Sequence, residues 1–292
     1  MASRPRFLPY LAFTVTAGIW GSTFLVIRIS NEAMPPVWAA SMRLLLAGCI
    51  LSAVLLVSRQ PFPKGEAFKA AVAYGACTMG INFSLLYWGE TRLPSGLAAV
   101  LYATSPISAA LLARAFGLEQ LTPRKLIAAV LAVIGVAVIF WHEMQTGLPA
   151  WPILAVLGAA IFGVLGAILL KRGPKQSAIG SNAIGAFVGA PLAFLASTAF
   201  GEAHAIPSTA AQIMPLLYLT IAGSVGAFVI FAWLLGRWQT SSVAFLGAVV
   251  PVIAVILGAV VKQEHLSGWS LIGGVIVLVA TLTAILGEKN GH

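Results

Sequence analysis

The sequence predicts an all-α integral membrane protein with ten transmembrane helices, arranged as a 5+5 inverted-topology repeat around a central cavity. Three observations lead to this fold class. The chain has too few charged residues for a water-facing surface. Apolar stretches long enough to cross a bilayer recur along it, and its two halves repeat one another at a fixed offset.

The composition excludes the soluble classes. Of the 292 residues, 60% are hydrophobic and 9% are charged, with a mean hydropathy of +0.97. A soluble domain carries about 25% charged residues. The net charge of +9 comes from Lys and Arg that occur singly or in pairs between apolar runs. A basic groove for nucleic acid needs clustered cations, so no nucleic-acid partner is expected.

The apolar stretches indicate the positions of the spans. A helix needs about 20 apolar residues to cross about 30 Å of hydrocarbon. On this criterion, we expect helices at about 9–27, 37–57, 67–89, 94–114, 124–141, 151–170, 178–200, 212–235, 241–261 and 268–286. The N-terminal run mimics a signal peptide, but no clean A-x-A site follows it. We therefore take this run as an uncleaved first helix.

The distribution of Lys and Arg predicts the orientation. With the N-terminus inside the cell, 13 of the 17 Lys and Arg residues fall on inner segments and 4 on outer ones. Cytoplasmic loops carry the excess of positive charge. Both termini are therefore expected in the cytoplasm.

An internal repeat relates the two halves at an offset of 145 residues. In one ungapped register, Trp88 meets Trp233, Arg92 meets Arg237, Pro106 meets Pro251 and Glu119 meets Glu264. The predicted repeats are residues 1–145 and 146–292, with five helices each. An odd number of helices per repeat inverts the second copy. Inverted repeats are typical of secondary transporters.

These residues carry a resemblance to a known family. The stretches 97–136 and 242–280 resemble the two EamA modules of the drug/metabolite transporter superfamily, and Trp20-Gly21-Ser22 resembles its first-helix signature. Within the superfamily, the likeness is strongest to bacterial aromatic amino-acid exporters of the YddG type. The resemblance implies a cavity lined by helices 1, 3, 4, 6, 8 and 9, and export of small metabolites across the bacterial inner membrane.

Polar residues in the third predicted helix form a candidate substrate surface. Tyr74, Thr78 and Asn82 recur at intervals of four residues and so share one helical face. An unpaired amide in lipid costs several kcal/mol, so this face should point into protein or a cavity. The alternative is that the three residues bond a neighbouring helix.

The fourth predicted helix adds Tyr102 and Ser105, followed directly by Pro106. A proline removes a backbone hydrogen bond and kinks a helix. Its repeat counterpart, Pro251, is expected to do the same in helix 9. The pair forms either a hinge for alternating access or two static kinks.

Two aromatic residues lie at matching depth away from the helix ends. Trp20 is halfway along the first predicted helix, and Phe162 is at the equivalent depth of the sixth. Together they suggest an apolar slot for substrate, with lipid contact or core packing as the alternative.

Arg43 is the ionised residue that lies well inside a predicted span, roughly seven residues or about 10 Å along helix 2. We expect it to snorkel to the outer headgroups or to pair with Glu32 or Glu90. The sharper hypothesis is that it contacts a substrate carboxylate.

Missing residue types exclude other chemistry. The chain has no Asp, and no Glu or His falls at mid-bilayer. Proton relays in carriers use such groups, so uniport or weak coupling is expected. Intramembrane enzymes need the same residues, and the four His show no metal-ligand spacing. We therefore expect no enzyme activity, no cofactor and no metal.

The favoured function is an inner-membrane secondary transporter that exports aromatic or neutral apolar amino acids by alternating access. The alternative is export of drugs, amines or purines, with proton coupling open. A phosphorylated-metabolite exchanger would need several buried cations, and a non-transport membrane protein has little use for an inverted repeat. The expected partners are a small-molecule substrate and membrane lipid, with monomer and dimer both open.

Overall fold

The computed structural model describes residues 7–91, 101–118, 120, 122–139, 150–262 and 268–286, and within these ranges the secondary structure is helical. The elements are α1 (Leu8–Ala33), α2 (Pro36–Val57), α3 (Glu66–Tyr74), η1 (Gly75–Ile81), α4 (Asn82–Glu90), α6 (Ser105–Ala115), α7 (Pro123–Ile139), α8 (Ala150–Arg172), α9 (Ala178–Ala199), α10 (Ala210–Tyr218), η3 (Leu219–Gly226), α11 (Ala227–Leu235), α12 (Thr240–Ala244), α13 (Leu246–Lys262) and α14 (Gly268–Leu286).

Six of these helices are long and apolar enough to cross a membrane. They run over Leu8–Ala33, Pro36–Val57, Glu66–Glu90, Trp151–Arg172, Ala178–Ala199 and Ala210–Leu235. The other apolar helices in the described ranges are shorter, so the count of ten spans stays a prediction. The first helix continues to Ala33, six residues beyond its predicted end, and so includes Arg28 and Glu32.

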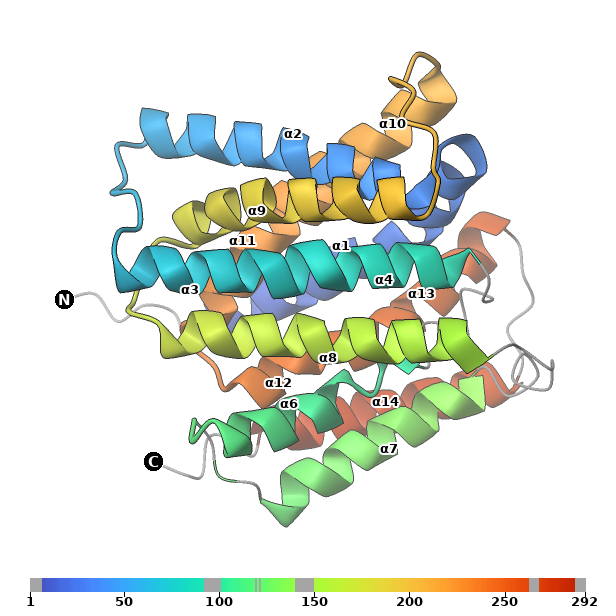
Figure 1. Cartoon of the computed structure of the whole chain (residues 1–292). Helices are drawn as coiled ribbons and strands as arrows, with labels where there is room; N and C mark the ends of the chain where they lie inside the picture. Colours follow the sequence, from blue (N-terminus) through green and yellow to red (C-terminus); the bar gives the residue numbers. More distant parts are fainter. Residues whose placement is uncertain are drawn as a thin grey trace.

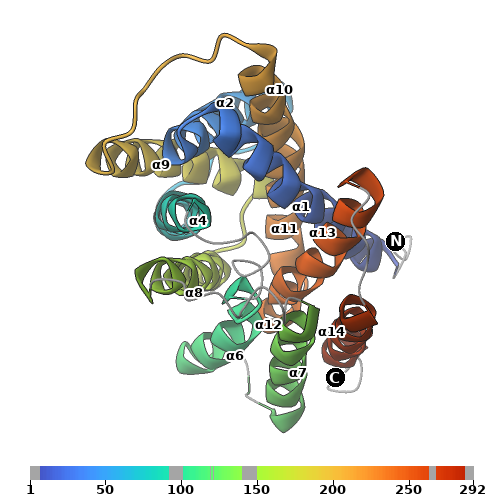
Figure 2. The ribbon, with the colours of Figure 1, turned by 90° about the vertical axis from the view of Figure 1, so that its right-hand side faces the viewer.

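The long helices run side by side along one axis of the molecule (Figure 1). In the end-on view of Figure 2, the pair α2 and α9 lies at one end of the bundle and the pair α7 and α14 at the other. Between these pairs, α1 packs on α11 and α13, while α8 packs on α4 and α6. The middle of the bundle is therefore bounded by helices from both halves of the chain.

Two long helices each contain a π-helical segment. The segment η1 joins α3 to α4, and η3 joins α10 to α11, so each group forms one continuous rod. The offset of 145 residues relates α4, which covers 82–90, to α11, which covers 227–235. A π-helical turn contains one more residue than an α-helical turn and is frequent at functional sites.

The two prolines of the repeat occupy different local structures, contrary to the expected equivalence. The chain turns at Ala103 and Thr104, and α6 begins at Ser105 with Pro106 in its first turn. Pro106 has no N–H for the carbonyl of Tyr102, and this carbonyl accepts a bond from the Ser105 hydroxyl instead. Pro251 lies inside the continuous α13, six residues after the break at Phe245.

Small residues allow the closest helix contacts. A Cβ at Gly75 would lie 2.4 Å from the Cα of Gly185, so η1 and α9 touch through their backbones. At Gly21, a Cβ would lie 2.5 Å from the Ile253 side chain, where α1 crosses α13. Such contacts are the usual basis of helix association in lipid, because apolar burial from water contributes little there.

This packing predicts that Gly75→Ala destabilises the protein. The added methyl meets backbone, which cannot swing aside, and overpacking of this kind costs about 1–3 kcal/mol. Gly18→Ala is the matched control, because nothing lies within 4 Å of its added Cβ. The measurement is the melting midpoint of each purified variant in detergent, and equal midpoints for the two variants would contradict the close contact.

Candidate functional site

A cavity of about 120 Å³ lies in the middle of the bundle. Its walls come from α1, η1, α4, α8, α11, α12 and α13, together with Tyr102 and Ser105 at the start of the α6 region. The helix α2 contributes one residue, Arg43. The cavity therefore lies where helices from both halves of the sequence meet.

One wall of the cavity is aromatic. The Trp20 ring lies 5.2 Å from Phe228 and 5.1 Å from Phe231, in edge and tilted arrangements that aromatic pairs prefer. Phe83 extends the wall, with its ring 5.6 Å from that of Phe228. The indole N–H of Trp20 donates to the carbonyl of Gly223 at 3.5 Å, which ties the ring to η3.

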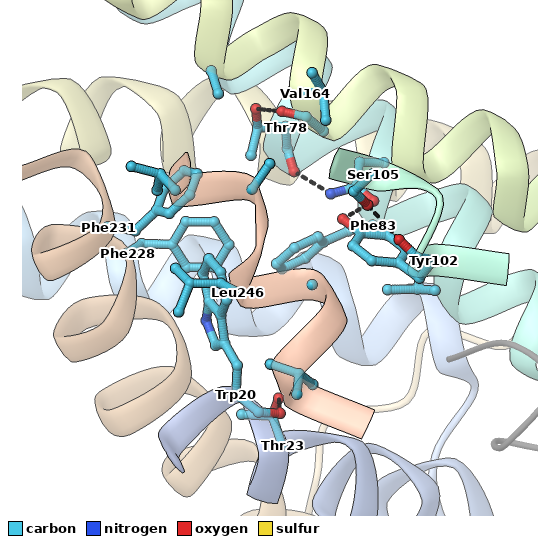
Figure 3. Close-up of a pocket in the computed structure, with 18 of the residues that line it drawn as sticks. Trp20, Thr23, Thr78, Phe83, Tyr102, Ser105, Val164, Phe228, Phe231 and Leu246 are labelled. Carbon is cyan, nitrogen blue, oxygen red and sulfur yellow. Dashed lines mark hydrogen bonds between the residues drawn. The ribbon is translucent and has the colours of Figure 1, made fainter. Parts of the chain in front are cut away.

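The other wall is polar. In Figure 3, Tyr102 and Ser105 lie across the cavity from Trp20, Phe228 and Phe231. The Tyr102 hydroxyl donates to Oδ1 of Asn82 at 3.3 Å, and the Asn82 amide donates to the Thr78 carbonyl at 3.0 Å. The Thr78 hydroxyl donates to the carbonyl of Gly163 at 3.0 Å. The cavity is thus mostly apolar and amphipathic in its arrangement, with rings on one side and a few hydrogen-bonding groups on the other.

Glycines in α8 position the polar wall. A Cβ at Gly166 would lie 2.2 Å from the Thr78 hydroxyl oxygen, and one at Gly163 would lie 3.0 Å from the Tyr102 hydroxyl oxygen. Gly166 has no room for a side chain, because its Cβ would also lie 2.9 Å from the backbone N of Thr78, and a Cβ at Gly163 would require Tyr102 and Asn82 to shift. The close approach of α8 therefore brings Thr78, Asn82 and Tyr102 together.

Arg43 is buried in the bundle, contrary to the expectation that it snorkels to the headgroups. Its side chain is 3% exposed. Nε donates to the Ser224 hydroxyl and Nη1 to the Tyr87 hydroxyl, both at 2.7 Å, and the guanidinium lies 4.9 Å from the Phe83 ring centroid. It forms no ion pair with Glu32, Glu90 or any other residue that the structure describes. Its partners come from η3 and α4, which are distant in the sequence.

Three of the predicted site residues lie outside the cavity wall: Tyr74, Phe162 and Pro106. Tyr74 is fully buried, and its hydroxyl donates to Oδ1 of Asn182 on α9 at 3.2 Å. The prediction placed Tyr74 on the face of Thr78 by counting α-helical turns. The π-helical segment changes this register, and Tyr74 faces α9 instead. The predicted residues Trp20, Thr78, Asn82, Tyr102, Ser105 and Pro251 do line the cavity.

Sequence reasoning missed most of the aromatic wall. Phe228 and Phe231 lie in α11, which is apolar on every side, and Phe83 lies in α4, where polar and apolar residues are not separated onto two faces, so hydropathy singles out no face in either helix. The internal repeat held a usable signal, because the offset of 145 residues relates Phe83 to Phe228. Tyr87 was missed for the same reason, although Arg43 holds it through a hydrogen bond.

The described cavity wall contains one ionisable cation, Arg43, and no Asp, Glu or His. Within the described part of the chain, no three His, Cys, Asp or Glu side chains form a group that could hold a metal ion. The arrangement is suited to binding a small amphipathic molecule between rings and hydrogen-bonding groups.

A bundle of apolar helices around an internal amphipathic cavity is the architecture of a membrane transporter. The chain belongs to the EamA-like transporter family, whose sequence pattern matches residues 8–141 and again residues 150–286. The resemblance to the drug/metabolite transporter superfamily is thereby confirmed, and the protein is a membrane transporter of this family.

Bacterial relatives match almost the whole chain. An uncharacterized inner membrane transporter, YedA of Escherichia coli K12, is 28% identical, over 91% of this chain and 87% of its own. A probable amino-acid metabolite efflux pump of Salmonella typhimurium is 30% identical, over 96% of this chain and 95% of its own. Protein PecM of Dickeya dadantii is 28% identical, over 90% of this chain and 88% of its own. A solved crystal structure shares the fold with a TM-score of 0.79 at 18% identity, over 98% of this chain and 100% of its own.

The contrast between two tyrosines gives a test of the site. Tyr74→Phe leaves the buried amide oxygen of Asn182 without its Tyr74 donor, which lowers the free energy of unfolding by about 1–3 kcal/mol. Tyr102→Phe also removes a hydroxyl that donates to an amide oxygen, that of Asn82. This oxygen lies at the cavity, where water can replace the lost donor. Melting midpoints should therefore fall further for Tyr74→Phe than for Tyr102→Phe, and the reverse order would contradict this assignment of the two residues.

Proposed function

We propose that the protein exports aromatic or neutral apolar amino acids across the bacterial inner membrane by alternating access. The observation that carries this proposal is the amphipathic cavity, with Trp20, Phe228 and Phe231 across from Tyr102, whose hydroxyl bonds Asn82. An aromatic or aliphatic side chain fits the ring wall, while the polar wall offers hydrogen bonds to the amino-acid backbone atoms. Ligand pockets typically combine a mostly apolar lining with a few polar groups that orient the ligand.

The names of two relatives support the amino-acid class. The Salmonella relative described above and a relative from Escherichia coli K12, 28% identical over 93% of this chain and 92% of its own, are both named as probable amino-acid metabolite efflux pumps. The motifs of this sequence also resemble those of the YddG-type aromatic exporters, and this resemblance suggests the aromatic members of that class.

The proposed mechanism uses two inverted halves, residues 1–145 and 146–292, with both termini in the cytoplasm. Two features support this division. The offset of 145 residues that aligns Trp88 with Trp233 also relates α4 to α11. The packing is reciprocal as well, because α8 contacts α4 and α6 as α1 contacts α11 and α13.

Transport is proposed to be uniport or weakly coupled. The described cavity wall has no carboxylate or imidazole that could carry a proton during the cycle. Substrate would then flow down its own gradient.

Counterflow in proteoliposomes tests the function. With unlabelled substrate inside, labelled substrate outside and no ion gradient, phenylalanine, tryptophan and methionine should drive uptake of their labelled forms. Trp20→Ala should lower this uptake several-fold, because it removes the ring that packs on Phe228 and Phe231. Uptake of amines, drugs or purines alone would favour the alternative substrate class. Strong accumulation driven by an external acid pulse would contradict uniport.

The prolines test the mechanism. If Pro106 and Pro251 are hinges, Pro106→Ala and Pro251→Ala should each slow counterflow several-fold, because alanine restores a backbone N–H that can bond the carbonyl four residues earlier and stiffens the chain at that point. Pro191→Ala is the matched control. This proline lies inside α9, exposed and away from the cavity, so its replacement should leave the rate unchanged. Wild-type rates for both Pro106→Ala and Pro251→Ala would contradict the hinge hypothesis.

A further inference from the structure

Arg43 has donors that the protein does not use. A guanidinium carries five N–H donors. Nε donates to Ser224 and one Nη1 hydrogen to Tyr87, which leaves three N–H groups without an acceptor among the described residues. The guanidinium is nevertheless buried and belongs to the cavity wall.

Both acceptors that hold Arg43 are neutral hydroxyls, so no anionic group among the described residues compensates its charge. Burying a cation without a counter-ion is costly, and proteins usually pair such groups. The candidates for pairing, Glu32 and Glu90, form no ion pair with it. A negative charge supplied from the cavity would complete the site.

The geometry points to Arg43 as the group that binds the carboxylate of the transported molecule. This inference deepens the proposed function and rests on it. The planar guanidinium binds a carboxylate through two parallel N–H···O bonds, which a neutral amide or an amine cannot accept in the same way. Its held position means that little side-chain entropy is lost when the carboxylate binds.

The surroundings of Arg43 indicate the rest of the substrate. The guanidinium lies 4.9 Å from the centroid of Phe83, whose ring lies 5.6 Å from that of Phe228. A carboxylate on Arg43 therefore brings the attached side chain against the aromatic wall. Since Arg43 is the one ionisable cation in the described wall, the site favours a single carboxylate over a phosphate with two negative charges.

The test compares ligands that differ only at the two polar groups of phenylalanine. The ligands are phenylalanine, 3-phenylpropionate, phenylalaninamide and phenylethylamine. The proteins are the wild type, Arg43→Gln, Arg43→Lys and Ser224→Ala. The first measurement is the rise in melting midpoint of each purified protein with increasing ligand, because a ligand that binds the folded state stabilises it.

The wild type should be stabilised by the two carboxylates and little by the amide or the amine. Arg43→Gln should lose roughly tenfold to a hundredfold in apparent affinity for the carboxylates. Arg43→Lys should keep part of it, because the charge remains without the planar fork.

Ser224→Ala separates binding from packing. It removes one hydrogen bond of Arg43 but leaves the charge, so the protein should become less stable while its preference for carboxylate over amide persists. Equal response of the wild type to carboxylate and amide, or an unchanged preference in Arg43→Gln, would overturn the inference.

Counterflow distinguishes this inference from the proposed function. If the wild type moves no amino acid, the proposed function fails. The inference still stands in that case if 3-phenylpropionate stabilises the wild type and not Arg43→Gln. If amino acids are transported but Arg43→Gln keeps the wild-type preference for carboxylate over amide, the inference fails alone.

Discussion

The site depends on how closely the helices approach one another at glycine. In lipid, helices gain little from apolar burial and associate through close packing and interhelical hydrogen bonds. Gly166 and Gly163 let α8 come near enough for Thr78 to bond the Gly163 carbonyl and for Tyr102 to reach Asn82. On the far side of η1, the contact of Gly75 with Gly185 fixes the same rod against α9. The polar wall is thus held from two directions.

Two buried polar side chains then tie the rods that contain the π-segments. From α2, Arg43 bonds Tyr87 and Ser224; from α9, Asn182 bonds Tyr74 and the Phe228 carbonyl at 3.1 Å. Both groups therefore link the rod α3–η1–α4 to the rod α10–η3–α11. Tyr74 and Tyr87 are 13 residues apart, which is about 20 Å along a helix. A movement that separates the two rods along their whole length must therefore lengthen these links.

The sequence predicts helix positions well, because hydropathy and length decide which segments can lie in a bilayer. It also predicts the cavity residues Thr78 and Asn82, whose polarity requires a partner or a cavity. It fails where the determining contact is tertiary. The acceptors of Arg43 lie on two other helices. Tyr74 faces α9 because a π-helical segment follows it, and no local sequence pattern predicts that segment. The rings of Phe228 and Phe231 have no polar neighbours to mark their face.

The paired π-segments also bear on the ancestry of the chain. Gly75–Ile81 and Leu219–Gly226 end 145 residues apart, at the same offset that aligns the tryptophans and prolines of the two halves. A π-turn arises when one residue is inserted into an α-helix. The family pattern matches the chain twice, and a single insertion in one ancestral unit before its duplication would account for both segments with one event. Independent insertions would have to strike matching positions twice.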